Sequence, residues 1–373
     1  MAFLSSDHAG SYLPVTRSPT AMAGRYEIID PDGDLEVILA SPSSILGPCG
    51  EAESSRLETT VGELDNPKEA QPTTLFRVSL KHVAFASPYF NNRLQKQLIE
   101  DHGDGGYCWR VEGFDADAMA IVLNVIHGKS SQVPLQLDLD TLAELARIVD
   151  YMQCLEVITV YANRWIDALE HQITESYNSE LLLWICIAGV FRRRVIFERC
   201  TRVAIFGNHS GIATFGLPIL PAIKEEINRR RTHHLDKIFT AVYDLMDHLG
   251  KGTRCCLSCD SLCLGVLTKC LYTNSFTSRP TSPYTRLSVA RAVKMFNSLP
   301  SQFGVTKKVK GFIEEGRGLS TVASSDLWEP AIKGDPDWDT LCLHCGFDEL
   351  ITTICFLQFD INGLGLEDIP CTQ

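Results

Sequence analysis

Residues 75–94, LFRVSLKHVAFASPYFNNRL, constrain the fold of this chain more than any other stretch. They predict a short strand over Leu75–Ser79 that passes directly into a helix running from Lys81 to Phe90, followed by a second helical stretch. The segment contains no acidic residue, and we expect the first helix to be buried, with Ser-Pro-Tyr-Phe at its end. The other elements of the domain are therefore expected on either side of this strand–helix unit in the sequence.

A turn and two further strands flank this unit. Asp30-Pro-Asp-Gly33 predicts a turn, because Pro fixes φ and Gly permits the positive φ that a turn can require. The alternative of a calcium loop fails, since Leu35 and Ser41 stand where that loop needs Gly and Glu. We expect the two strands over residues 35–40 and 107–113.

Three helices follow the last strand. Asp115 is the expected N-cap of the first, and Gly128 marks its C-terminal end. Thr141 and Glu144 have the spacing of a capping box at the start of the second. The third covers residues 155–170 with an apolar face. Three short strands and about five helices in roughly 140 residues predict a compact α+β domain.

Composition divides the chain into regions. Residues 1–24 and 41–73 are polar and rich in Ser and Pro, which predicts a disordered N-terminus and a disordered loop inside the domain at 25–170. Residues 171–373 predict a mostly α-helical C-terminal region, with loops and short helices over 271–340 and a last apolar segment at 348–361.

Charge and cysteine content exclude several classes of protein. A formal net charge of −12 argues against a general binder of nucleic acid or of anionic membranes. The longest apolar run, residues 181–191, is shorter than the about 20 residues of a membrane span. The N-terminus does not look like a signal peptide, so the 14 cysteines indicate reduced thiols or metal ligands in the cytoplasm or nucleus.

Several of these segments together resemble a BTB/POZ domain. They are Asp34-Leu-Glu-Val-Ile-Leu, Phe76-Arg-Val, Phe85-Ala-Ser-Pro-Tyr-Phe90 and Asp115 with its apolar helix. The DPDGD, IHG and RWIDAL segments are similar to those of filamentous-fungal members, and the resemblance covers about residues 27–170. It implies short strands packed by about five helices, with the Ser-Pro-Tyr-Phe segment in the core. One departure is Ser79, because many members carry His at this position.

The resemblance implies a non-enzymatic adaptor or scaffold that binds another protein, or a second copy of itself, through the BTB/POZ domain. No nucleotide-binding loop, nucleophile elbow or paired-His metalloprotease motif is present, so we predict that the chain is not an enzyme. We expect no nucleic-acid partner, no membrane partner and no small-molecule substrate. The alternative is a zinc-stabilised nuclear regulator of transcription.

The cysteine-rich segments predict one structural zinc site, the only cofactor we expect. Cys342-x-x-Cys345 has the spacing of a zinc knuckle, and Cys255-x-x-x-Cys259 can place ligands on successive turns of a helix. The ligands would be Cys255 or Cys256, Cys259, Cys345 and either Cys342 or His344. In the competing interpretation, the cysteines around 255–270 fill a helix interface without metal.

For three other groups of residues, a structural role is favoured over a binding site. The basic clusters Arg192–Arg194 and Arg229–Arg231 predict solvated helix faces rather than a localisation signal or a phosphate site. His233 and His234 are expected at the surface rather than in a metal or pH site. Trp165 and Trp184 are expected in the core, as are three cysteines, Cys154, Cys186 and Cys200.

Overall fold

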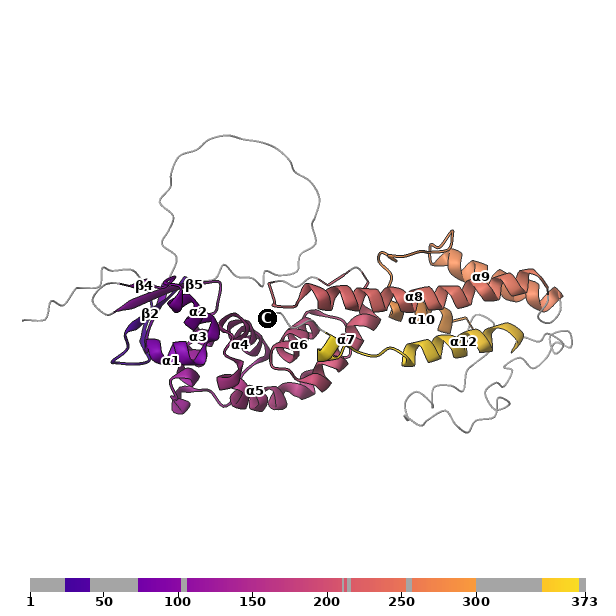
Figure 1. Ribbon diagram of the computed structural model, residues 1–373. Helices are drawn as coiled ribbons and strands as arrows, with labels where there is room; N and C mark the ends of the chain where they lie inside the picture. The colour runs from indigo at the N-terminus through magenta and orange to yellow at the C-terminus, as the bar shows by residue number, and fades with distance from the viewer. Residues whose placement is uncertain are drawn as a thin grey trace, which may run out of the picture. The chain divides into compact units, whose positions relative to one another are not determined.

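The structure is a computed structural model. It describes residues 24–40, 73–101, 106–209, 211–212, 216–252, 257–299 and 344–368 (Figure 1). These residues form a mixed α/β protein with a five-stranded sheet and eleven α-helices. They divide into two compact units. The first has the described residues up to Pro134 and Tyr151–Ile158, and the second has Leu135–Asp150 and the described residues from Thr159 onward. The two segments predicted to be disordered lie outside the described residues, except for Gly24 and Thr73.

The sheet lies in the first unit, in the order β1-β3-β2-β5-β4. Its strands are β1 (Tyr26–Ile28), β2 (Leu35–Ala40), β3 (Thr73–Val78), β4 (Glu100–Asp101) and β5 (Tyr107–Glu112). The central strand β2 pairs antiparallel with β3 and parallel with β5. The edge strands are short, and β1 runs parallel to β3 while β4 runs antiparallel to β5.

Strand β2 has the bounds that its sequence predicts. Leu35, Val37 and Leu39 are buried while the residues between them are half-buried, as the period of two requires. The predicted strand at Leu75 begins earlier, because Thr73 already pairs with Ala40. The strands β1 and β4 were not predicted.

The turn between β1 and β2 forms as expected, but Gly33 has a different role there. The Gly33 N–H donates to the Asp30 carbonyl at 3.0 Å, which closes the turn. A Cβ at Gly33 would lie 2.5 Å from the Val78 carbonyl oxygen. Glycine is therefore needed because another strand's backbone passes close by, and not because φ is positive.

The predicted helix from Lys81 to Phe90 is two helices, α1 (Leu80–Ala86) and α2 (Pro88–Gln95). Ser87 between them is extended and fully buried. Its hydroxyl accepts the Phe90 N–H at 3.0 Å and donates to the Met152 carbonyl at 2.6 Å. Pro88 occupies the first position of α2, where its missing N–H costs nothing. Ser-Pro-Tyr-Phe thus begins a helix rather than ending one.

Helix α1 is also less buried than predicted. Val83 is its buried residue, whereas the Phe85 side chain is 90% exposed. Helix α3 (Ala116–Ile126) contacts both α1 and β3. Its ends are as predicted, since the Asp115 carboxylate accepts the Ala118 N–H and Gly128 has a positive φ just past the C-cap.

The helices α4 (Leu139–Met152) and α5 (Leu155–Leu169) are divided between the two units. The predicted capping box is wrong: the Asp138 carboxylate accepts the Thr141 N–H, and the helix begins before Thr141. One face of α4 is apolar and fully buried, with Leu142, Leu145, Ile148, Val149 and Met152 at 1% exposure or less. Trp165 on α5 is buried as predicted.

The second unit is helical and is organised around the 30-residue helix α8, which α7, α9, α10 and α12 contact (Figure 1). Its elements are α6 (Ser179–Val190), α7 (Arg194–Gly207), α8 (Pro221–Gly250), α9 (Leu257–Thr273), α10 (Val289–Asn297) and α12 (His344–Phe359). Short 3-10 helices lie at η1 (Ser130–Gln132, in the first unit), η2 (Glu170–Gln172) and η5 (Leu366–Asp368). Trp184, Cys186 and Cys200 are buried in the second unit as predicted, and Cys154 is buried in the first unit.

A short segment after α12, Asp360–Leu364, packs on α7 and α8, and we call it the C-terminal strap. Its Ile361 and Leu364 side chains are 3% and 1% exposed. The buried Thr201 hydroxyl on α7 accepts the Leu364 N–H at 2.8 Å and donates to the Phe197 carbonyl at 2.7 Å. Apolar burial and a satisfied backbone amide therefore hold the strap on α7.

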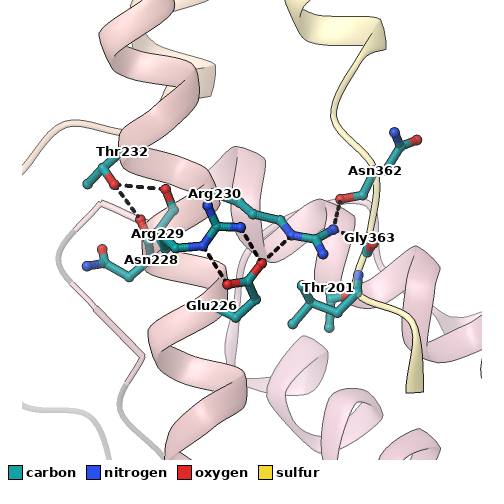
Figure 2. Close-up of polar contacts among 9 residues, drawn as sticks. Thr201, Glu226, Asn228, Arg229, Arg230, Thr232, Asn362 and Gly363 are labelled. Carbon is teal, nitrogen blue, oxygen red and sulfur yellow. Dashed lines mark hydrogen bonds and ion pairs between the residues drawn. The ribbon is translucent and has the colours of Figure 1, made fainter. Parts of the chain in front are cut away.

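Arg230 on α8 completes the attachment of the strap (Figure 2). Its Nη1 donates to the Gly363 carbonyl at 2.9 Å, and its Nε lies 2.8 Å from the Glu226 carboxylate, which fixes the guanidinium. A Cβ at Gly363 would lie 1.8 Å from the Glu198 carbonyl oxygen of α7. The strap can approach this closely only because position 363 is glycine.

Candidate functional site

The residues predicted to bind zinc lie at the limits of what the structure describes. Cys255, Cys256 and Cys342 fall outside the described residues. Cys259 lies in α9, whereas His344 and Cys345 begin α12, and only the backbone of these three is described. The zinc site therefore remains a prediction.

Two neighbouring cysteines are packing residues, in line with the competing interpretation. Cys263 and Cys270 on α9 are both 2% exposed. The Cys270 thiol lies 3.9 Å from the Met295 carbonyl of α10, and burial raises its pKa. These two thiols fill helix contacts as small apolar groups.

Polar contacts concentrate where β3 enters α1 in the first unit. The N-terminal amides of a helix lack intrahelical partners, and the Ser79 side chain makes no capping bond here. Instead, the Leu80 N–H donates to the Asp34 carboxylate at 2.7 Å, and the Ser79 N–H donates to His127 Nε2 at 3.0 Å. Residues from the β1–β2 turn and from the end of α3 thus satisfy these amides.

The imidazole of His127 is held at both nitrogens. Its Nε2 accepts the Ser79 N–H, so the proton lies on Nδ1, which donates to the Leu123 carbonyl at 2.7 Å. Burial lowers the pKa of His127, although the Leu123 carbonyl opposes that shift. The ring is therefore neutral at pH 7.

Two other groups stand beside this ring. The His82 ring on α1 has its centroid 5.0 Å from that of His127. Ligand atoms of Asp30, His82 and His127 all lie within 4.8 Å of one another. The Asp30 carboxylate also accepts the Asp32 N–H at 3.1 Å. Sequence reasoning missed this cluster because its members lie about 50 residues apart and form no local motif.

The first unit also exposes large apolar side chains. Tyr26 and Ile28 are 52% and 53% exposed on β1, and Phe85 is exposed on α1. Residues two apart on a strand share a face, so Tyr26 and Ile28 point the same way. Strand β1 is an edge strand of the sheet, and its outer edge pairs with no other described strand.

The predicted solvated cluster Arg229–Arg231 is only partly correct. Arg229 is exposed and pairs with Glu226 at 2.6 Å (Figure 2). Arg231 is 2% exposed, and its guanidinium donates to Asn228 and to the carbonyls of Pro283, Tyr284 and Leu287. One helix thus directs neighbouring arginines to solvent and to the interior, so a continuous basic patch does not form at this site.

The other basic cluster is also divided among separate partners. Arg193 donates to Asn163 at 3.1 Å and pairs with Asp167 at 2.5 Å. Arg194 pairs with Glu198 at 2.9 Å and with Glu367 at 3.0 Å. These arginines connect elements within the second unit.

His234 is not a surface residue, contrary to the prediction. Its side chain is 6% exposed, and its Nδ1 has no hydrogen-bond partner among the described residues. Burial lowers its pKa, and the neighbouring charges of Lys237 and His233 act in the same direction. We therefore describe His234 as a neutral core residue of α8.

No model of a known protein family matches this chain, and no curated protein matches it. Among the residues that the structure describes, no helix is both long enough and apolar enough to cross a membrane.

Proposed function

We propose that the chain is a non-enzymatic adaptor that binds another protein, or a second copy of itself, through a BTB/POZ-type domain in residues 25–170. The observation that carries this proposal is the exposed apolar material of the first unit: Tyr26 and Ile28 on an unpaired edge strand, and Phe85 on α1. An unpaired strand edge that also exposes apolar side chains can pair with a strand of another chain.

The architecture of the first unit supports the same proposal. Its core is a small mixed sheet with α1, α2 and α3 beside it, as the resemblance implies. Ser87 and Phe90 of the Ser-Pro-Tyr-Phe segment are fully buried, and the Phe90 ring lies 4.9 Å from that of Trp109 on β5. This core leaves the edge strand and the outer side of α1 available to a partner.

The proposal can be tested with the full-length chain and two surface variants. Phe85→Ser removes the most exposed aromatic ring, and Ile28→Lys puts a charge on the edge strand, where it opposes strand addition. Val195→Ser on α7 is the matched control, because Val195 is also highly exposed, at 74%, but lies outside residues 25–170. Circular dichroism should show that all three variants fold.

The readouts are light scattering for self-association and quantitative affinity purification for other partners. We expect a specific partner, or the second copy, to be lost from Phe85→Ser or Ile28→Lys and retained by Val195→Ser. A partner set that is the same for all variants would contradict the proposal. Salt-sensitive DNA binding by the wild-type chain would instead support the zinc-stabilised transcription regulator.

A further inference from the structure

We propose that Asp30, His82 and His127 form a binding site for a divalent transition-metal ion such as Zn²⁺. This site is independent of the adaptor function and of the cysteine-rich segments. Its three donors come from the β1–β2 turn, from α1 and from the C-terminal end of α3. Such a site would join three elements that are far apart in the sequence.

The donor set determines which class of ion would bind. Two imidazoles and one carboxylate suit zinc and its neighbours, whereas calcium and magnesium prefer sites made of oxygen donors only. With three protein ligands, a tetrahedral ion keeps its fourth position for water or for a group from a bound partner. Asp30 also supplies a negative charge that offsets part of the charge of the ion.

Two of the three donors are already oriented by their surroundings. A metal-binding histidine commonly donates its second ring N–H to a carbonyl or carboxylate, and His127 Nδ1 makes such a bond to Leu123. This contact fixes the tautomer with the lone pair on Nε2. The Asp30 carboxylate is restrained in a similar way by the Asp32 amide.

Binding requires two local adjustments. Ligand bonds of about 2.0–2.1 Å in a tetrahedron place ligand atoms about 3.4 Å apart, so the group, which spans up to 4.8 Å, must contract. The exposed His82 side chain can move to close this gap. The ion must also replace the Ser79 N–H at His127 Nε2, so the Ser79 amide should report on metal binding.

The test uses the full chain, stripped with a chelator and titrated with zinc chloride against a chromophoric zinc chelator. His82→Ala and Asp30→Asn remove one ligand each, and the amide oxygen introduced by Asp30→Asn can still accept the Asp32 N–H. His171→Ala is the matched control, since His171 is an exposed histidine in the second unit. Cys259→Ser separates this site from the predicted cysteine site.

We expect wild type, His171→Ala and Cys259→Ser each to bind zinc at this site. In His82→Ala and Asp30→Asn, the affinity of the site for zinc should fall about ten-fold or more. Zinc should raise the melting temperature of Cys259→Ser but not that of the double variant with His82→Ala, while the two metal-free proteins melt alike. When Cys259→Ser is fully loaded with cobalt in place of zinc, the ion in this site should have nitrogen and oxygen ligands.

Zinc binding by His82→Ala with wild-type stoichiometry and affinity would overturn the proposal. So would a wild-type chain that binds no zinc. Binding that disappears in Cys259→Ser but persists in His82→Ala would assign the metal to the cysteine-rich segments instead.

Discussion

Substitution of Gly363 by Ala tests how the C-terminal strap is held. The new Cβ would meet main-chain atoms of Glu198 on α7, with the carbonyl oxygen only 1.8 Å away. The backbone of a packed helix cannot move aside by the required distance, whereas the strap can leave its site. We therefore expect the Ala variant to release the strap rather than to distort α7.

The magnitude follows from what the strap gains by docking. Burial of Ile361 and Leu364 contributes about 3–6 kcal/mol in total, taking about 1.5–3 kcal/mol for each side chain. The bonds to Thr201 and Arg230 add about 1 kcal/mol each. Fixing five residues opposes this with about 1–1.5 kcal/mol per residue. The difference is at most about 3 kcal/mol, which is the greatest loss of stability that release of the strap can cause.

Hydrogen exchange measured by mass spectrometry on peptides that cover residues 360–364 is the direct assay. A loss of about 2 kcal/mol should lower the protection of the Leu364 amide roughly 30-fold, while α7 remains protected. Gly365→Ala is the matched control, because its Cβ would meet only the flexible carboxylate end of Glu367. Equal protection in Gly363→Ala and wild type, or an equal loss in Gly365→Ala, would refute the reasoning.

Three further predictions concern individual polar groups. Thr201→Val should reduce the free energy of unfolding by about 1–3 kcal/mol, because it leaves the buried Leu364 N–H without an acceptor, whereas Thr201→Ser should cost less in a denaturant titration. Burial lowers the pKa of folded His127 below its ordinary 6.5, so the unfolded chain takes up a proton first as the pH falls. The free energy of unfolding should thus decrease from about pH 6.5 downward, level off below the folded pKa, and vary less in His127→Gln; an unchanged pH profile in that variant would contradict this. Arg231→Lys should destabilise the second unit by about 2 kcal/mol or more, because Lys cannot reproduce the forked bonds to three carbonyls, and an unchanged denaturation midpoint would rule this out.

The sequence predicted elements that have a regular apolar period. Strand β2 and the apolar face of α5 were predicted correctly, because alternation and helical spacing are local properties. Strands β1 and β4 have three and two residues, which is too short for a period to be visible. Phe85 lies on a helix that was expected to be buried, yet its side chain is 90% exposed, because the course of the chain around α1 decides its exposure.

Polar residues were harder to predict because their partners are distant. Nothing near Arg231 in the sequence indicates that its partners are backbone carbonyls more than 50 residues away. The contact of His127 with Ser79 likewise depends on how α3 returns to β3. Ser87 was expected in the core at the end of a helix; it is buried, but it caps the start of α2, and its distant partner is the carbonyl of Met152.

The three consecutive arginines of α8 should tolerate mutation very differently. Successive residues of a helix point about 100° apart, so each of the three meets a different environment. Arg229 is exposed, so many polar residues should be tolerated at this position. At position 230, Lys should still donate a hydrogen bond to the strap and so retain part of the function of Arg230. At Arg231, almost every replacement should be purged by selection. In a deep mutational scan of protein abundance, tolerance to substitution should therefore fall steeply from Arg229 to Arg231, although the three residues are identical.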